Sequence, residues 1–143
     1  MGVVCVDASL VVKWIVDEEE SELALEILES WLSGGVTIIS PTLLIYEVPS
    51  VLRKLTVKGK LTPVRAWEGF QYLGAIGIQI ESSARLLLKA WEISMQFRMP
   101  TIYDAAYVAL AEIKGCPLYT CDRRLIRAVH GRLPWVKGLT DQV

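Results

Sequence analysis

Short apolar runs alternate with longer segments of helical periodicity along the chain. Runs rich in β-branched residues predict buried strands at 3–6, 36–39, 76–80, 117–121 and, more weakly, 135–136. Helical spacing and capping signals predict helices over 10–16, 23–31, 41–55, 63–74, 83–97, 103–113 and 123–129. Strands that alternate with helices indicate an α/β domain, with a mainly parallel sheet that helices cover on both faces.

The size and composition of the chain are typical of one globular domain. It has 143 residues, of which 52% are hydrophobic and 22% are charged, and this length is too short for two separate cores. We therefore expect residues 1–143 to form a single domain. No apolar run approaches the roughly 18 residues that span a bilayer, and the N-terminus lacks a signal-peptide pattern. A cytoplasmic protein without membrane association is expected.

The cysteine and histidine content directs attention to carboxylates. Cys5, Cys116 and Cys121 lack the paired spacing of a zinc site, and the only histidine is His130. A structural zinc or a disulfide framework is therefore not expected, although Cys116 and Cys121 can pair in an oxidising or very hot cytosol. Chemistry based on imidazole would depend entirely on His130.

Several acidic residues fall where the predicted fold can bring them together. Asp7 and Asp122 each follow a predicted strand and precede a helix. Both therefore lie at the carboxyl edge of a parallel sheet, where open α/β folds bind ligands. Asp104 lies in the first turn of its own predicted helix. Glu47 is embedded in an apolar run, where an unpaired charge is costly.

Four carboxylates in one place require a compensating charge. They would repel one another, and some would be forced to protonate. A divalent cation removes this penalty, and oxygen ligands with open water positions suit Mg²⁺ or Mn²⁺. Such a cation polarises a phosphoryl oxygen and provides hydroxide near neutral pH. The pattern therefore favours metal-dependent chemistry on a phosphodiester.

Each acid also has a purely structural interpretation. The two aspartates that follow strands are typical N-cap residues. Thr101 and Asp104 have the spacing of a variant capping box. Glu47 can form a salt bridge with Lys54 or with a distant arginine. The structural and functional interpretations are compatible, because a capping carboxylate can also bind a metal.

Four motifs, in this order along the chain, resemble those of the PIN-domain family, and most closely the VapC-type toxins of toxin–antitoxin pairs. The motifs are Asp7-Ala8-Ser9 with Lys13-Trp14 behind it, Tyr46-Glu47-Val48, the stretch from Tyr103 to Ala111, and the stretch from Thr120 to Leu125. The resemblance covers essentially the whole chain, and the last two motifs are the most specific. It implies a three-layer α/β/α sandwich with a five-stranded parallel sheet.

The resemblance also implies an activity, a site and partners. The activity is that of a magnesium- or manganese-dependent endoribonuclease. The catalytic and metal-binding residues would be Asp7, Glu47, Asp104 and Asp122. Ser9 and Thr120 match hydroxyl positions that commonly flank this site. In the toxins an antitoxin chain normally covers the site and the protein commonly self-associates, so we expect an antitoxin partner and a homodimer.

Clustered basic residues are candidates for contacts with the RNA backbone. The net charge of −1 argues against binding through overall charge, but the bases gather near the predicted acids. The candidates are Lys13, Arg53, Lys54, Arg123 and Arg124. Such contacts position a strand without reading its sequence, and a single strand or loop is favoured over a duplex. The alternative is that these bases are solvated helix faces.

Other functions remain open. Many toxins have asparagine three residues after the glutamate, whereas this chain has Ser50, and Pro49 removes a helical hydrogen bond. A non-catalytic PIN-fold module that binds RNA or protein is therefore an alternative, as is a PIN nuclease in RNA processing without an antitoxin. A phosphatase with an aspartate nucleophile is disfavoured, because Ser9 stands where that pattern requires a second aspartate.

The aromatic content has two interpretations. The chain has five tryptophans, which either fill the core or form an exposed apolar patch for a homodimer or an antitoxin helix. Trp67, Phe70 and Tyr72 are the candidates for such a patch.

Overall fold

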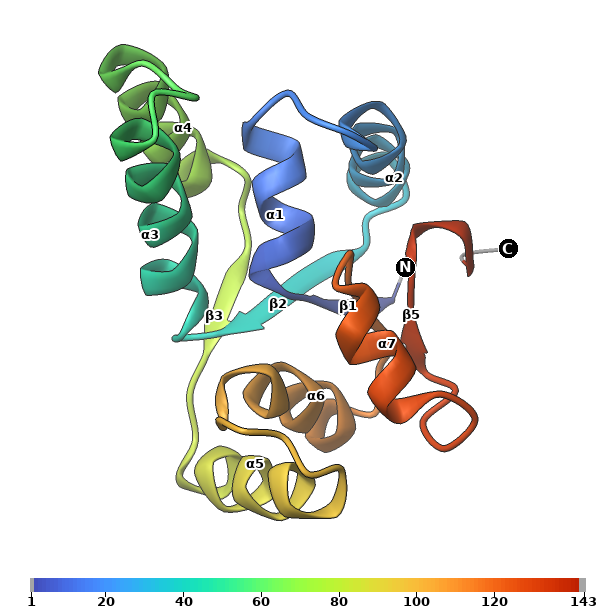
Figure 1. Cartoon of the computed structure of the whole chain (residues 1–143). Coiled ribbons are helices and arrows are strands. Elements are labelled where there is room, and N and C mark those ends of the chain that lie inside the picture. Colours follow the sequence, from blue (N-terminus) through green and yellow to red (C-terminus); the bar gives the residue numbers. More distant parts are fainter. Residues whose placement is uncertain (1, 142–143) are drawn as a thin grey trace.

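Among residues 2–141, which the computed structural model describes, five strands form one parallel sheet (Figure 1). The strand order is β3-β2-β1-β4-β5, so the first strand lies at the centre. The strands are β1 (Val3–Val6), β2 (Thr37–Pro41), β3 (Gln79–Glu81), β4 (Leu118–Tyr119) and β5 (Val136–Lys137). The predicted parallel α/β fold is confirmed.

Helices connect the strands close to the predicted positions. They are α1 (Ala8–Ile15), α2 (Ser21–Ser33), α3 (Leu44–Val57), α4 (Pro63–Ala75), α5 (Ala84–Gln96), α6 (Tyr103–Lys114) and α7 (Arg123–Val129). The predicted caps form, since the side chains of Thr62 and Ser83 accept hydrogen bonds from the first turns of α4 and α5. Gly115 ends α6 in the left-handed conformation, with φ of 65°.

Among the element boundaries that differ from the prediction, two at the starts of elements have identifiable reasons. The third strand begins at Gln79 rather than Ile76, because Ile76 is buried as the C-cap of α4 and Gly77 turns the chain at φ of 90°. The helix predicted from residue 41 begins at Leu44, because Pro41 still pairs with Glu81 in the sheet. The sequence alone does not show whether an apolar residue before a glycine, such as Ile76, ends a helix or begins a strand.

The helices cover both faces of the sheet in three layers. Helices α1 to α4 lie on one side, and α5 and α6 lie on the other (Figure 1). Helix α6 contacts β1, β2 and β4, whereas α7 packs against β5. The starts of α1, α3 and α7 all follow strand ends at the carboxyl edge of the sheet. Within the part of the chain that the structure describes, no helix is both long and apolar enough to cross a membrane.

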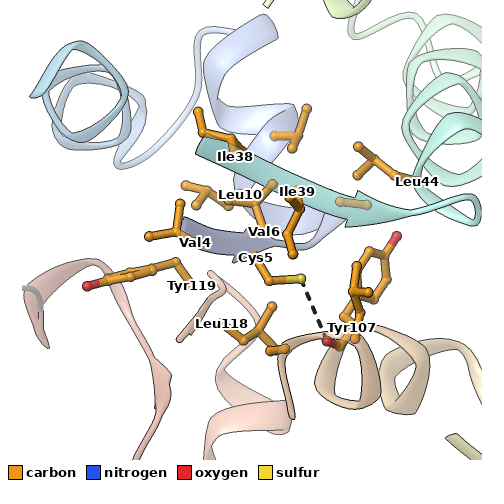
Figure 2. Close-up of a cluster of buried hydrophobic side chains, with 14 of the residues drawn as sticks. Val4, Cys5, Val6, Leu10, Ile38, Ile39, Leu44, Tyr107, Leu118 and Tyr119 are labelled. Atoms are coloured by element: carbon orange, nitrogen blue, oxygen red, sulfur yellow. Dashed lines mark hydrogen bonds between the residues drawn. The ribbon is translucent and has the colours of Figure 1, made fainter. Parts of the chain in front are cut away.

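The core lies on β1, β2 and β4 and on the helices that pack against them (Figure 2). Cys5, Leu10 and Leu118 are fully buried. The three cysteines are free, so the pairing of Cys116 with Cys121 that the sequence left open does not form. Trp14 and Trp31 are also buried and meet edge to face.

The predicted exposed aromatic residues all lie on α4. Trp67 and Phe70 are 59% and 46% exposed, with their rings 5.7 Å apart, and Tyr72 is 43% exposed. Core packing therefore accounts for part of the aromatic content only. The exposed aromatic side chains form an apolar surface on α4.

Close packing of α4 against α1 predicts a large effect of one methyl group. A Cβ at Gly69 would lie 2.5 Å from Cγ2 of Ile15. We expect Gly69→Ala to lower the free energy of unfolding by about 1–2 kcal/mol, because overpacking outweighs the gain in helix propensity. Gly74→Ala in the same helix meets nothing within 4 Å and should be neutral or stabilising by up to about 1 kcal/mol. Urea unfolding compares the two, and equal effects would contradict the packing argument.

Candidate active site

Asp7 ends β1 and caps α1, and three donors hold its carboxylate. Oδ1 accepts hydrogen bonds from the backbone N–H of Leu10 at 3.1 Å and from the Ser9 hydroxyl at 2.7 Å, while Oδ2 accepts one from the Thr120 hydroxyl. The residue is only 3% exposed. The predicted N-cap therefore exists, and its carboxylate is fixed in one orientation.

The two hydroxyls also tie the end of β1 to the turn that follows β4. Ser9 Oγ accepts a hydrogen bond from the N–H of Cys121, and Thr120 Oγ1 accepts one from the N–H of Asp122, both at 2.9 Å. The two hydroxyl oxygens are 3.2 Å apart. Because side chains take over these backbone groups, β4 ends at Tyr119, two residues before the predicted end. The predicted supporting residues thus link two parts of the site.

Asp122 lies at the start of α7. Its Oδ1 accepts hydrogen bonds from the N–H groups of Arg124 at 2.9 Å and Leu125 at 3.3 Å. It is therefore an N-cap, as the structural interpretation proposed. Its side chain also interacts electrostatically with Asp104, so the cap lies beside the other acids.

Asp104 is the carboxylate that interacts with each of the other three. Burial is the main cause that raises the pKa of Asp104. The charges of Asp122 and Glu47 raise this pKa further, whereas the charge of Arg124 lowers it. The pKa of Asp7 is raised to about 6, mainly by burial and to a smaller extent by the charge of Asp104, against the hydrogen bonds described above. The structure therefore brings Asp104 within electrostatic range of each of the other three predicted acids.

The alternative capping box at the start of α6 is not formed. Thr101 accepts a hydrogen bond from the N–H of Tyr103 at 3.3 Å, and Ile102, the N-cap of α6, provides no side-chain cap. Within residues 2–141 the Asp104 carboxylate has no hydrogen bond or ion pair to another residue. Its oxygens are available to a ligand.

Glu47 lies in the first turn of α3 and is half-buried. Its Oε1 accepts a hydrogen bond from the Tyr107 hydroxyl at 2.5 Å. The proposed salt bridge to Lys54 or to a distant arginine is wrong for the described part of the chain. Sequence reasoning missed Tyr107, although it lies one helical turn after Asp104. The available signal was a tyrosine in an apolar helix, on the same face as an acid. The hydroxyl of a buried tyrosine needs a polar partner, which pointed to a residue of the site.

The acids do not form a preorganised metal cage. Among the side chains that the structure describes, no three of the His, Cys, Asp and Glu types are close enough to hold one ion. The donor set nevertheless fits a hard cation, because Mg²⁺ commonly uses one or two carboxylates and completes its shell with water and substrate phosphates. Asp104, with free oxygens and three acidic neighbours, is the centre of that donor set.

The predicted RNA-binding bases differ in how they are engaged. Lys13 Nζ lies 3.4 Å from Glu18 and donates to the carbonyl of Glu19 at 2.7 Å. Arg123 lies 4.0 Å from Glu20, and Arg124 lies 3.9 Å from Asp122. Arg53 and Lys54 are exposed on α3. Their contact with RNA stays a prediction.

Together, the fold and the acidic edge define a parallel α/β protein with a candidate site for cation-dependent chemistry. The PIN domain model matches residues 4–131. Ribonuclease VapC3 of Pyrobaculum aerophilum is 36% identical over 127 residues, which cover 84% of this chain and 89% of that protein. Ribonuclease VapC9 of Mycobacterium tuberculosis is 33% identical over 94 residues, covering 66% and 72%. The chain belongs to the PIN-domain family, and the resemblance inferred from its motifs is confirmed.

Solved structures show the same fold at lower sequence identity. PAE2754 from Pyrobaculum aerophilum matches with a TM-score of 0.68 and 22% identity, covering 98% of this chain and 93% of its own. VapC20 of Mycobacterium tuberculosis, a sarcin–ricin loop cleaving toxin, matches at 0.65 and 18%, covering 87% and 94%. VapBC2 from Rickettsia felis, bound to a DNA fragment from its promoter, matches at 0.67 and 13%, covering 88% and 92%.

Proposed function

We propose that this chain is a divalent-metal-dependent endoribonuclease and the toxin of a toxin–antitoxin pair. The observation that carries the proposal is the excess of negative charge at the carboxyl edge. Asp104 interacts there with three other acids, and among the described residues Arg124 alone offsets their charge. The relatives named as VapC ribonucleases support the same activity. A group of carboxylates of this kind requires a cation before it can bind a phosphodiester.

In this proposal the four acids bind the cation and the two hydroxyls orient one of the acids. Asp7, Glu47, Asp104 and Asp122 would hold Mg²⁺ or Mn²⁺. When bound, the cation would supply the positive charge that stabilises the phosphoryl oxygens during hydrolysis. Ser9 and Thr120 orient Asp7 by donating to its two oxygens. Asp104 presents oxygens that have no other partner among the described residues.

Exposed bases and an apolar hollow support our proposals for the substrate and the partners. Arg53, Lys54, Arg123 and Arg124 are exposed on α3 and α7, and we propose that they and Lys13 bind the backbone of an unpaired RNA strand or loop. Pro49, Trp67 and Phe70 line an apolar hollow of about 300 Å³ beside α4, a surface suited to an antitoxin helix. We further propose a single domain over residues 1–143, a homodimer and a cytoplasmic location.

The non-catalytic alternative has one observation in its favour. No three ligating side chains of residues 2–141 are preorganised around an ion. Calorimetric titration with Mn²⁺ separates the two proposals. Binding that is lost in Asp104→Asn supports the nuclease, whereas a silent titration of the wild-type chain supports a module that has lost cleavage.

Cleavage of unstructured RNA is expected to require Mg²⁺ or Mn²⁺ and to stop when a chelator is added. Asp122→Asn should lower the cleavage rate at least about 100-fold. It should leave the chain folded, because asparagine is an equally good N-cap for α7. A gel assay of a labelled RNA, with circular dichroism as the folding control, tests both results. Cleavage at the wild-type rate in chelator or in this variant would show that the proposed function or its site is wrong.

A further inference from the structure

The hydrogen bond between Tyr107 and Glu47 joins the two helical layers at the candidate site. Tyr107 lies on α6 and Glu47 on α3, on opposite sides of the sheet (Figure 1). The tyrosine hydroxyl donates to Oε1 of Glu47 at 2.5 Å. We propose that Tyr107 is a positioning residue, which holds the Glu47 carboxylate at a fixed place relative to Asp104. This inference rests on the proposed function.

Tyr107 is itself held firmly. Its side chain is 1% exposed, and its backbone carbonyl accepts a contact from the Cys5 thiol on β1 at 3.7 Å (Figure 2). Figure 2 also shows the ring extending from α6 to the side where Leu44 begins α3. Burial and the neighbouring Glu47 raise the pKa of Tyr107 above its usual range, so the hydroxyl stays protonated as a donor.

Glu47, in contrast, lies in a weakly supported part of its helix. Helix α3 begins at Leu44 without a side-chain cap. Pro49 has no N–H, so the carbonyl of Ile45 in this turn lacks its usual helical hydrogen bond. The carboxylate also interacts unfavourably with Asp104. Without the tyrosine hydroxyl, the glutamate side chain would relieve this repulsion by turning toward solvent.

The spacing on α6 explains why a hydrogen bond to Tyr107 fixes the geometry of the site. Asp104 and Tyr107 are three residues apart, so they lie on the same face of the helix. One helical turn and one hydrogen bond therefore determine where the Glu47 carboxylate lies with respect to Asp104. A residue with this role acts through Glu47 and need not touch the substrate.

A double-mutant cycle of Tyr107→Phe and Glu47→Ala tests the proposal. Tyr107→Phe removes only the hydroxyl. We expect it to lower kcat for Mg²⁺-supported RNA cleavage about tenfold, the effect of losing one hydrogen bond to a charged group. KM should change by less than about twofold, and Mn²⁺ affinity measured by calorimetry without RNA should fall. In the Glu47→Ala background the same change should cause no further loss of kcat or of Mn²⁺ affinity.

Controls separate positioning from a general loss of stability. Ser94→Ala removes another buried hydroxyl, which donates to the carbonyl of Trp91 at 2.7 Å on α5, and should leave kcat and Mn²⁺ affinity unchanged. The inference would be overturned if Tyr107→Phe lowered kcat and Mn²⁺ affinity equally in the wild-type and Glu47→Ala backgrounds. It would also be overturned if the Tyr107→Phe variant kept the wild-type kcat and Mn²⁺ affinity. A wild-type chain that binds Mn²⁺ without cutting RNA would overturn the proposed function. The Mn²⁺ affinities of the four proteins in the double-mutant cycle would then decide the role of Tyr107. A wild-type chain that does neither would overturn both.

Discussion

Asp104→Asn is expected to lower metal-supported RNA cleavage by about 1000-fold, which corresponds to about 4 kcal/mol of transition-state stabilisation. Asp104 interacts electrostatically with Asp7, Glu47 and Asp122. Its carboxylate has no partner of its own within residues 2–141. Asparagine keeps the shape but removes the charge and one acceptor oxygen, so the cation would lose its central ligand. Single-turnover kinetics on a labelled RNA measure this loss.

A matched control lies on the same helix. Glu112 is exposed on α6, eight residues after Asp104, and forms a salt bridge with Lys89 at 2.9 Å. Glu112→Gln removes one negative charge from the same helix and should leave cleavage within about twofold of wild type, because exposed ion pairs contribute little. Cleavage by Asp104→Asn within tenfold of the wild-type rate would contradict the central place of this carboxylate.

The second large effect is on stability in the absence of metal. The pKa of Asp7 is raised from 3.8 to about 6 in the folded chain, mainly by burial. The folded state therefore binds this proton more tightly than the unfolded state does. Its stabilising contribution is fully present below pH 3.8 and is lost as the pH rises through about 6. A pKa raised from 3.8 to about 6 corresponds to about 3 kcal/mol.

Asp7→Asn isolates this contribution. The asparagine carbonyl can still accept the hydrogen bonds from Leu10 and Ser9, but the side chain no longer ionises. Between about pH 4 and pH 8, we expect the free energy of unfolding of the variant relative to wild type to increase by about 3 kcal/mol. Urea unfolding in chelator over this range measures the difference, in which contributions common to both proteins cancel. A difference that is constant with pH would contradict the burial of an ionised Asp7.

Much of the fold was predictable because local signals agreed with tertiary packing. Asp122 as a cap before Arg123 and Gly115 as a helix end correctly placed α7 and the end of α6. Ile76 was misassigned, because an apolar residue at the end of a helix and one in a buried strand look alike in sequence.

The sequence predicted which acids form the candidate site, but it did not predict all of their hydrogen-bond partners. Asp7 and Asp122 follow strands, and parallel strands share one carboxyl edge, so their proximity followed from topology. The partner of Glu47 did not follow, because Tyr107 is 60 residues away and only the packing of α6 against the sheet brings it near. Lys13 was predicted to contact the RNA backbone. Its contacts with Glu18 and with the Glu19 carbonyl did not follow from the sequence, because they depend on the turn after α1.

The position of a bound cation tests the central claim most directly. Anomalous diffraction from a crystal of the chain grown with Mn²⁺ would locate the ion. Our account predicts a peak within about 2.5 Å of an Asp104 oxygen, with at least one other of the four carboxylates in its coordination shell. A peak on another face of the protein, or none at saturating Mn²⁺, would contradict it.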